Sequence, residues 1–388
     1  MQQTKLLTIK EASRWASDFL KRDVSESNIS YLVQYGKVRK RNGGSSVFVD
    51  LSDLKNYYDS YQDQRAIKHE QDNHQLKIDG LFPNTLAQCK KDFLNKLVSP
   101  SGKTKYKRYM GAPIRYAGGK SLAVGLVVER IPDETKRVIS PFLGGGSVEV
   151  AIAKELNLPV IGYDIFDILV NYWQVQLNNP EELYKKLSGF KPNKENFKKI
   201  KETLKKHWKG EKKLNNLDLA AHYYFNHNTS YGPGFLSWPS SVYMDGRKYK
   251  SMLEKVKNLK IENLKVYCDT FENVIPQYKN DFLYCDPPYF LDGDSKMFKG
   301  IYPQRNFPVH HNNFNHEKLR DLLLNHKGEF ILSYNDCSTI REWYKEFKFI
   351  DVSWQYTMGQ GETRIGLNRI NGNRNHIKQS HEILIVKR

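Results

Sequence analysis

The residues best suited to chemistry lie in the segment 281–289, which reads DFLYCDPPY. A short apolar run ends there in Asp286, Pro287, Pro288 and Tyr289. The run predicts a buried strand, because prolines cannot continue a hydrogen-bonded ladder. Asp286 and the Pro287 carbonyl can each accept one N–H from the exocyclic amine of a nucleobase, and Tyr289 can stack on the base. The alternative is that the prolines only end a strand and Asp286 caps the next helix.

A second candidate site lies in a glycine-rich turn upstream. The segment 137–156 predicts a strand, the turn PFLGGGS and a helix, which is the nucleotide-cradling unit of a Rossmann-like sheet. The next predicted strand, 159–163, ends in Asp164, where an acid can bind ribose hydroxyls. The glycines form neither GxGxxG nor a phosphate loop. A cofactor with an adenosine ribose and no pyrophosphate therefore fits better than a dinucleotide.

A third motif, IRYAGGK at residues 114–120, precedes that turn. Paired glycines let the backbone approach a ligand closely, and Lys120 near a helix N-terminus favours a carboxylate. In isolation this motif is weak, and its meaning depends on the motifs that follow it.

Taken in order, RYAGGK, FLGGGS, Asp164 and DPPY resemble the Dam-type family of adenine-N6 DNA methyltransferases over about residues 112–388. The resemblance implies an α/β fold with a Rossmann-like sheet, and S-adenosylmethionine (AdoMet) as the methyl donor. The segment 266–269 resembles the family's third strand, which would place Asp269 at the cofactor adenine. The cofactor-binding residues that the resemblance implies are Tyr116, Gly118, Lys120, Phe142, Gly144, Gly146, Asp164 and Asp269.

The chemistry that follows is direct methyl transfer to an adenine flipped out of duplex DNA. Catalysis would rest on positioning and oriented acceptors, without a covalent intermediate or a metal. The glycine motif carries no Pro-Cys nucleophile, which argues against cytosine-C5 chemistry. Three alternatives stay open: a cytosine-N4 methyltransferase, a ribosomal-RNA guanine-N2 methyltransferase, and a DNA-binding regulator with an inactive methyltransferase fold. Whether a cognate restriction endonuclease accompanies the protein is also open.

The methyltransferase core is expected at residues 111–177 and 262–388, separated by an insertion at 178–261. This insertion is too long for an ordinary crossover and matches the family's target-recognition region. Apolar residues at helical spacing between 183 and 204 predict one buried face. The aromatic, glycine-rich stretch 223–238 predicts a hairpin presented to a base stack. We expect Tyr223, Tyr224 and Phe225 to pack within the insertion, and DNA contacts from Asn228, Tyr231 and Arg247.

Residues 1–60 predict a separate small domain, followed by a polar connector at 61–110. A capping-box pattern at residues 8–11 opens one helix, a second helix starts near Ser27, and Asn-Gly-Gly signals a hairpin. This order resembles the winged helix-turn-helix of the excisionase and MerR type. The alternative is an interaction domain with a solvated charged loop. The DNA-binding residues expected in this domain are Lys37, Arg39, Lys40 and Arg41.

The composition of the whole chain supports an anionic partner. Its 388 residues carry a net charge of +18 with a pI near 9.4, as expected for a protein that binds double-stranded DNA. The four cysteines are scattered without zinc-ligand spacing, which indicates reduced thiols in the cytoplasm and no metal site. The sequence contains no long apolar span or signal-peptide pattern, so neither a membrane location nor secretion is expected.

Overall fold

The computed structural model describes residues 6–20, 24–34, 37–43, 46–59, 85–99, 105–232, 234–290, 314–352 and 382–388. The chain divides into two compact units, residues 1–83 and 84–388. Each unit has a hydrophobic core of its own. None of the helices in these described ranges is both long and apolar enough to cross a membrane.

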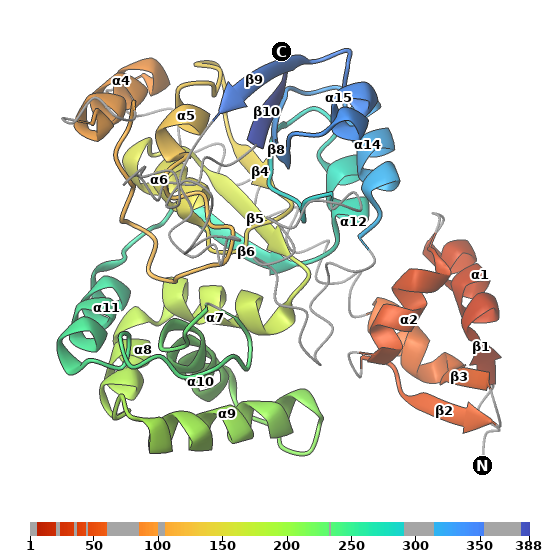
Figure 1. The fold of residues 1–388 in the computed structure, drawn as a ribbon. Coiled ribbons are helices and arrows are strands. Elements are labelled where there is room, and N and C mark those ends of the chain that lie inside the picture. Colours follow the sequence, from red (N-terminus) through yellow and green to blue (C-terminus); the bar gives the residue numbers. More distant parts are fainter. Residues whose placement is uncertain are drawn as a thin grey trace, which may run out of the picture. The chain divides into compact units, whose positions relative to one another are not determined.

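The first unit packs helices against a three-stranded antiparallel sheet of order β1-β3-β2 (Figure 1). Its first helix begins with the expected capping box: the Thr8 amide donates to Glu11 Oε2 at 2.8 Å, and the Glu11 amide donates to Thr8 Oγ1 at 3.3 Å. The predicted helices and hairpin strands are present, and β1 is an addition to them. The elements are β1 (Leu6–Thr8), α1 (Ile9–Leu20), α2 (Glu26–Gln34), β2 (Lys40–Gly43), β3 (Ser46–Asp50) and a helical segment at 51–59.

The second unit is built on a seven-stranded sheet of order β6-β5-β4-β7-β8-β10-β9 (Figure 1). The first five strands of this order run parallel, while β10 is antiparallel to both of its neighbours. The predicted α/β fold is therefore confirmed, whereas the winged helix of the first unit stays a prediction. The strands are β4 (Val138–Ser140), β5 (Val160–Asp164), β6 (Leu264–Cys268), β7 (Phe282–Cys285), β8 (Phe330–Asn335), β9 (Lys348–Val352) and β10 (Glu382–Lys387).

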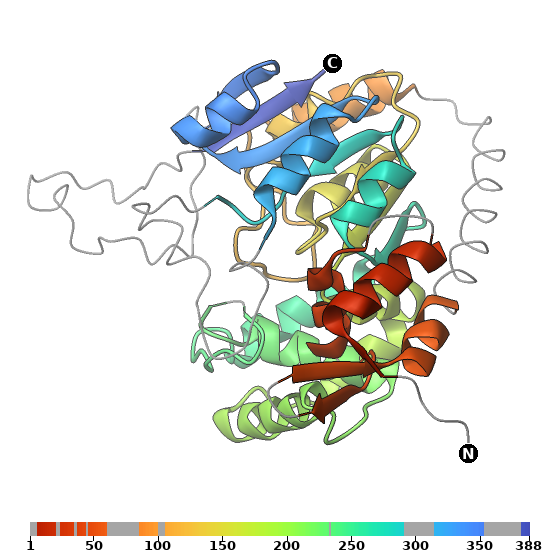
Figure 2. The same cartoon turned by 90° about the vertical axis from the view of Figure 1, so that its right-hand side faces the viewer.

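Alternate residues of each central strand face opposite helical layers. Val138 packs into one core, with α4, α5, α6 and α7, while Ile139 packs into the other, with α12, α14 and α15 (Figures 1 and 2). Such two-sided burial explains why the strands are almost wholly apolar. The helices are α4 (Leu86–Leu97), α5 (Val124–Val128), α6 (Ser147–Glu155), α7 (Asp167–Asn178), α12 (Phe271–Gln277), α14 (His316–Leu324) and α15 (Ser338–Trp343).

The strand order reverses between β4 and β7. The strand that follows β4 in the sequence, β5, lies on one side of it, and β7 lies on the other. In open parallel sheets, ligands bind outside the carboxyl ends of the strands at such a switch point. The glycine turn after β4 and the Asp286 segment after β7 both lie at this end of the sheet.

The insertion consists of helices packed beside α7 (Figure 1). The predicted apolar face is confirmed: Leu183, Leu187, Phe197, Ile200 and Leu204 are all buried. Tyr223, Tyr224 and Phe225 are also buried, as expected. The predicted hairpin is wrong for residues 223–228, which form the end of a helix. The insertion helices are α8 (Pro180–Ser188), α9 (Lys194–Trp208), α10 (Asn216–Asn228) and α11 (Gly246–Asn258).

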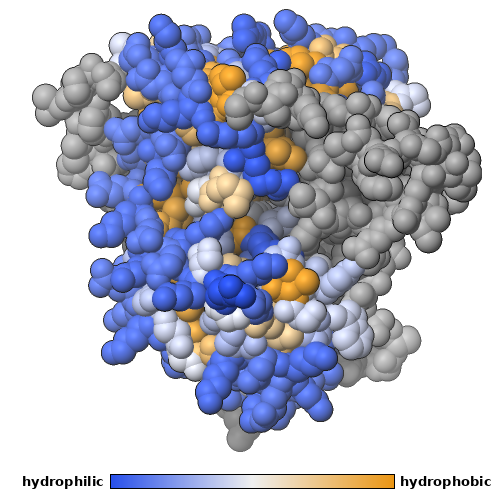
Figure 3. All heavy atoms as spheres, turned by 60° about the vertical axis from the view of Figure 1, so that its left-hand side comes forward, coloured by the Kyte–Doolittle hydropathy of each residue, from blue (hydrophilic) through white to orange (hydrophobic). Residues whose placement is uncertain are grey.

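Two predicted features lie outside the described residues. One is most of the stretch 290–315, whose Lys, Arg and His residues predict a basic loop after DPPY. The other is the Gly- and Asn-rich stretch between β9 and β10, which predicts a hairpin. On the face of the molecule drawn in Figure 3, hydrophilic side chains predominate among the described residues, with apolar ones scattered between them.

Candidate active site

The turn after β4 is shaped by glycines and closed by an aromatic ring. Gly144 and Gly146 adopt φ values of +48° and +61°, a region that disfavours other residues. A Cβ placed on Gly145 would lie 2.4 Å from the Cβ of Tyr116. Trp173 Nε1 donates to the Gly144 carbonyl at 3.0 Å. The structure thus brings RYAGGK onto the glycine turn, and contact with Tyr116 is one reason why no side chain fits there.

Asp164, at the end of β5, holds this turn in place. Its Oδ2 accepts the Gly144 amide at 2.9 Å, and its Oδ1 accepts the Phe166 amide at 2.9 Å. Burial raises the pKa of Asp164, and the amides of Phe166 and Gly144 oppose that rise. Each carboxylate oxygen can accept a further hydrogen bond. Asp164 can therefore support the turn and still bind a hydroxyl.

The remaining predicted cofactor residues surround the same sheet edge. Asp269 follows β6, accepts the Thr270 amide at 2.8 Å, and donates its own amide to the Asp164 carbonyl at 3.2 Å. Phe142 packs against Phe271, with ring centroids 5.6 Å apart. The carboxyl ends of β6, β5 and β4 thus place two carboxylates and a glycine turn side by side.

Asp286, directly after β7, forms an ion pair with Lys120. Lys120 Nζ lies 2.8 Å from Asp286 Oδ1 and donates to the Gly118 carbonyl at 2.9 Å. The exposed fraction is 4% for the lysine side chain and 20% for the aspartate. Burial raises the pKa of Asp286, the Lys120 ammonium and the Ser333 hydroxyl oppose it, and the net shift is upward. Lys120, expected among the cofactor-binding residues, thus lies against the residue expected to hold the amine.

Tyr289 follows Pro287 and Pro288 and is almost fully buried. Its hydroxyl donates to Glu382 Oε2 at 2.6 Å and lies 3.0 Å from Ser333 Oγ. The Lys120 ammonium lies 4.9 Å from the ring centroid. Ser333 lies in the stretch 329–336, which is predicted as a strand and resembles the family motif that helps form the base pocket. Glu382 was predicted only as the first residue of the last strand. The one signal for its role was an acidic residue at the start of the apolar run EILIV, because a buried carboxyl group needs a hydrogen-bond partner.

A further carboxyl, Glu149, was also missed. It lies in the first turn of α6, is 2% exposed, and accepts a hydrogen bond from Ser140 Oγ at 2.6 Å. Burial raises the pKa of Glu149 to about 8, with a smaller upward contribution from Asp286 and a downward one from Lys120. Its signal was an acid within the apolar run VEVAIA. Glu149 is thus neutral over much of the physiological range.

Comparison with known proteins decides the family. The model of the D12 class N6 adenine-specific DNA methyltransferases matches residues 116–358. The chain belongs to this family. The resemblance drawn from RYAGGK, FLGGGS and DPPY is thereby confirmed.

Two curated relatives are type II methyltransferases. M.MjaII of Methanocaldococcus jannaschii is 29% identical over 184 residues, which are 47% of this chain and 32% of the relative. M.FokI of Planomicrobium okeanokoites is 26% identical over 289 residues, which are 68% of this chain and 43% of the relative. The chain thus spans less than half the length of each of these two relatives.

The residues expected to contact DNA from the insertion lie in different environments. Asn228 is fully buried: its Oδ1 accepts the Arg115 amide at 2.8 Å, and its carbonyl accepts from Arg115 Nη1 at 2.7 Å. The prediction of DNA contact by Asn228 is therefore wrong, because this side chain anchors the segment before Tyr116. Tyr231 is 54% exposed, and Arg247 is exposed on α11. Trp238, not predicted, is 60% exposed, and its carbonyl accepts the Tyr231 amide at 2.7 Å.

The basic run of the first unit is only partly available to a partner. Arg39 donates to Asp53 through Nε at 2.6 Å and Nη2 at 2.7 Å. Lys37 and Lys40 are exposed, while the side chain of Arg41 lies outside the described residues. Lys40 is thus better placed for phosphate contacts than Arg39, whose guanidinium is paired with Asp53.

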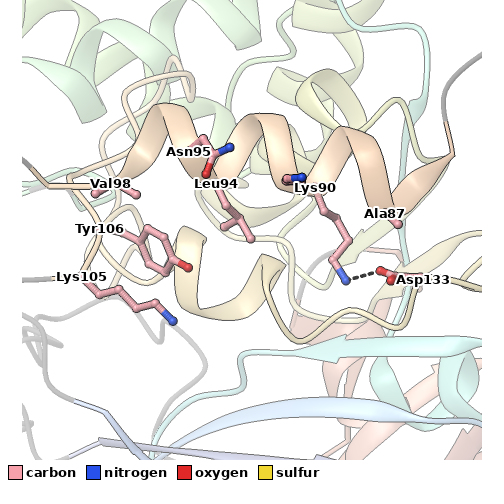
Figure 4. A pocket seen from close by; sticks show the side chains of 9 residues that line it. Ala87, Lys90, Leu94, Asn95, Val98, Lys105, Tyr106 and Asp133 are labelled. Carbon is pink, nitrogen blue, oxygen red and sulfur yellow. Dashed lines mark hydrogen bonds and ion pairs between the residues drawn. The ribbon is translucent and has the colours of Figure 1, made fainter.

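A cavity of about 390 Å³ lies beneath α4, away from the predicted site (Figure 4). Two of its lysines are already paired, Lys90 with Asp133 and Lys105 with Glu129, each at 2.6 Å. Its described lining contains none of the predicted catalytic or cofactor residues. The cavity is lined by Ala87, Lys90, Lys91, Leu94, Asn95, Val98, Lys105, Tyr106 and Asp133.

Proposed function

We propose that this protein transfers a methyl group from AdoMet to the N6 amine of an adenine within a specific sequence of double-stranded DNA. The observation that carries the proposal is the position of Asp286. In a chain of the D12 family, this carboxylate follows β7 at the switch point, beside the glycine turn after β4. The methyl donor and the acceptor amine would meet at this edge of the sheet.

The residues at the edge of the sheet fit an adenosine-containing methyl donor. Asp164 and Asp269 are acceptors at neighbouring strand ends, which suits ribose hydroxyls and an adenine amine, since both are donors. Tyr116 and the turn at residues 142–146 would hold the rest of the methyl donor. When bound, AdoMet supplies an electrophilic methyl group on its sulfonium.

The protein must hold the adenine N6 amine so that the nitrogen lone pair points at that methyl group. Asp286 and the Pro287 carbonyl accept the two amine N–H groups, which turns the nitrogen lone pair out of the ring system. For this the carboxylate must be ionised, and Lys120 must leave room at Oδ1. Methylation releases one amine proton, which Asp286 is placed to receive. Tyr289 orients the flipped ring.

The biological setting is part of the same proposal. The relatives' names point to type II modification, which supports a restriction–modification role, with a cognate endonuclease as the partner and the cytoplasm as the location. Exposed Tyr231 and Arg247 and the basic run of the first unit would contact the DNA.

The experiment that tests the proposal is transfer of a labelled methyl group from AdoMet by the purified chain. Unmethylated duplex DNA, single-stranded DNA and ribosomal RNA are offered separately and in competition. We expect label in duplex DNA. Label confined to RNA would contradict the proposal, and so would binding of DNA without any transfer.

A further inference from the structure

Tyr289 is held by two residues that come from neighbouring strands on the far side of the site. Its hydroxyl reaches Glu382 Oε2 at 2.6 Å and Ser333 Oγ at 3.0 Å. These partners lie 93 and 44 positions away in the sequence, so the sheet, rather than the DPPY segment, supplies them. All three side chains are at least 96% buried, with exposed fractions of 4% for Tyr289, 1% for Ser333 and 2% for Glu382.

The strand register places both partners on one face. In the antiparallel pair β8–β10, Glu382 lies opposite Asn335 and Leu384 lies opposite Ser333. Residues directly opposite share a face, and residues two apart along a strand also do. Glu382 and Ser333 are therefore diagonal neighbours, and one hydroxyl can bridge them. A shift of one residue in this register would turn Glu382 to the other face.

The same contacts lead on to the reacting carboxylate. Ser333 also lies against Asp286, whose pKa its hydroxyl lowers. The Lys120 ammonium lies both 4.9 Å from the centroid of the Tyr289 ring and 2.8 Å from Asp286 Oδ1. The Tyr289 ring thus lies next to the ammonium that pairs with Asp286.

We propose that Glu382, together with Ser333, is a positioning residue that fixes Tyr289 for methyl transfer. The carboxyl group of Glu382 accepts the phenol O–H, so the ring cannot swing or slide without leaving buried polar groups unpaired. A buried polar group left without its hydrogen-bond partner has lost its interactions with water and gains none in return. The inference rests on the proposed function, because it concerns how that same site holds a flipped adenine.

The test is a double-mutant cycle between Glu382→Leu and Tyr289→Phe. Each single variant removes the hydrogen bond between Tyr289 and Glu382, and Tyr289→Phe also removes the contact with Ser333. Each should lower kcat on unmethylated plasmid DNA by about ten- to a hundredfold, while KM for AdoMet stays unchanged. Because Tyr289→Phe already removes the bond that Glu382→Leu removes, the double variant should be no slower than Tyr289→Phe alone. Glu382→Gln keeps an acceptor oxygen and should recover most of kcat.

Controls separate positioning from folding. Ile385→Val trims a buried residue that faces away from Glu382 on the same strand, so it should lower Tm and leave kcat unchanged. If Glu382→Leu does not fold, the cycle is run between Ser333→Ala and Tyr289→Phe. Losses that multiply in the double variant, or Glu382→Gln as slow as Glu382→Leu, overturn the inference. If the wild-type protein itself is inactive, the proposed function is overturned as well. If the wild type is active but the losses of the two single variants multiply in the double variant, only the positioning role of Glu382 is overturned.

Discussion

The ion pair between Lys120 and Asp286 sets the charge of the central residue. Burial alone would favour a neutral carboxylic acid, which cannot accept both an amine N–H and the proton released on methylation. The ammonium at 2.8 Å works against that tendency. The pair therefore favours the ionised form of Asp286, which is the form that can accept an amine N–H.

The first prediction concerns pH and Lys120. The pKa of Asp286 lies above its ordinary value because burial outweighs the neighbouring cation, so activity should fall as the pH drops towards that raised pKa. Lys120→Met removes the main opposing charge and should move this acid limb to higher pH. The pH dependence of kcat for both proteins, at saturating AdoMet and DNA, measures the shift. An unchanged acid limb would show that Lys120 does not tune Asp286.

The second prediction concerns Asp164. Its carboxylate holds the Gly144 and Phe166 amides, so Asp164→Ala should lower Tm as well as weaken AdoMet binding. We expect a loss in binding of about 1–3 kcal/mol, the usual value for hydrogen bonds to a charged group. Isothermal titration measures it, and Asp164→Asn, which keeps one acceptor oxygen, is the matched variant. Unchanged affinity for AdoMet together with a lower Tm would mean that Asp164 only stabilises the turn and does not bind the cofactor.

At the scale of elements, the first turn of α6 carries a carboxyl whose burial makes stability depend on pH. Glu149 has a folded pKa of about 8, against about 4.3 for an ordinary glutamate. Between these values the folded chain keeps a proton that the unfolded chain has released. Stability therefore falls as pH rises through this window, by at most about 1.4 kcal/mol per pH unit.

The third prediction follows from this difference. Glu149→Gln keeps the acceptor for Ser140 and cannot ionise, so it should match the wild type near the lower end of the window and exceed it in stability near pH 8. Urea unfolding at several pH values measures the difference in the free energy of unfolding between the two proteins. A difference that stays constant with pH would mean that Glu149 does not titrate in this way.

The elements themselves were largely readable in the sequence. β7 is fully buried, and the prolines after it mark its end, so the Asp286 segment was placed correctly. Asn228 was misjudged because the second half of α10 is buried on nearly all sides, its polar residues Asn226 and Asn228 included. A helix buried all round has no amphipathic period that shows which of its polar residues face solvent. Glu382 was missed because its partner depends on the register of β8 and β10, which joins residues 93 positions apart.

At the scale of the whole molecule, most of the excess of basic residues lies in the second unit, because residues 1–83 carry 13 Lys and Arg against 11 Asp and Glu, a net charge of +2 out of +18. The fourth prediction concerns residues 37–41 of the first unit. If they bind DNA, replacing Lys37, Arg39, Lys40 and Arg41 with Ala should weaken binding and reduce its salt dependence by about 0.9 for each phosphate that is no longer neutralised. Because Arg39 is paired with Asp53, Arg39→Ala alone should change the slope less than Lys40→Ala.

The control for this prediction is Lys10→Ala, which removes an exposed charge of the same unit outside the basic run. DNA affinity across a salt series is measured for each variant, and deletion of residues 1–60 should leave AdoMet binding intact. If the variant with all four basic residues replaced and Lys10→Ala show the same salt dependence of DNA binding, the first unit serves a purpose other than DNA binding.

The central claim is that Asp286 holds an adenine amine for methylation. The measurement closest to it is mass spectrometry of nucleosides from duplex DNA incubated with AdoMet and either wild-type protein or Asp286→Ala. We predict N6-methyladenine with the wild type, and a rate about 100- to 1000-fold lower with the variant, because it lacks an oriented acceptor at the reacting atom. N4-methylcytosine as the main product, or N6-methyladenine formed equally fast by Asp286→Ala, would contradict the account.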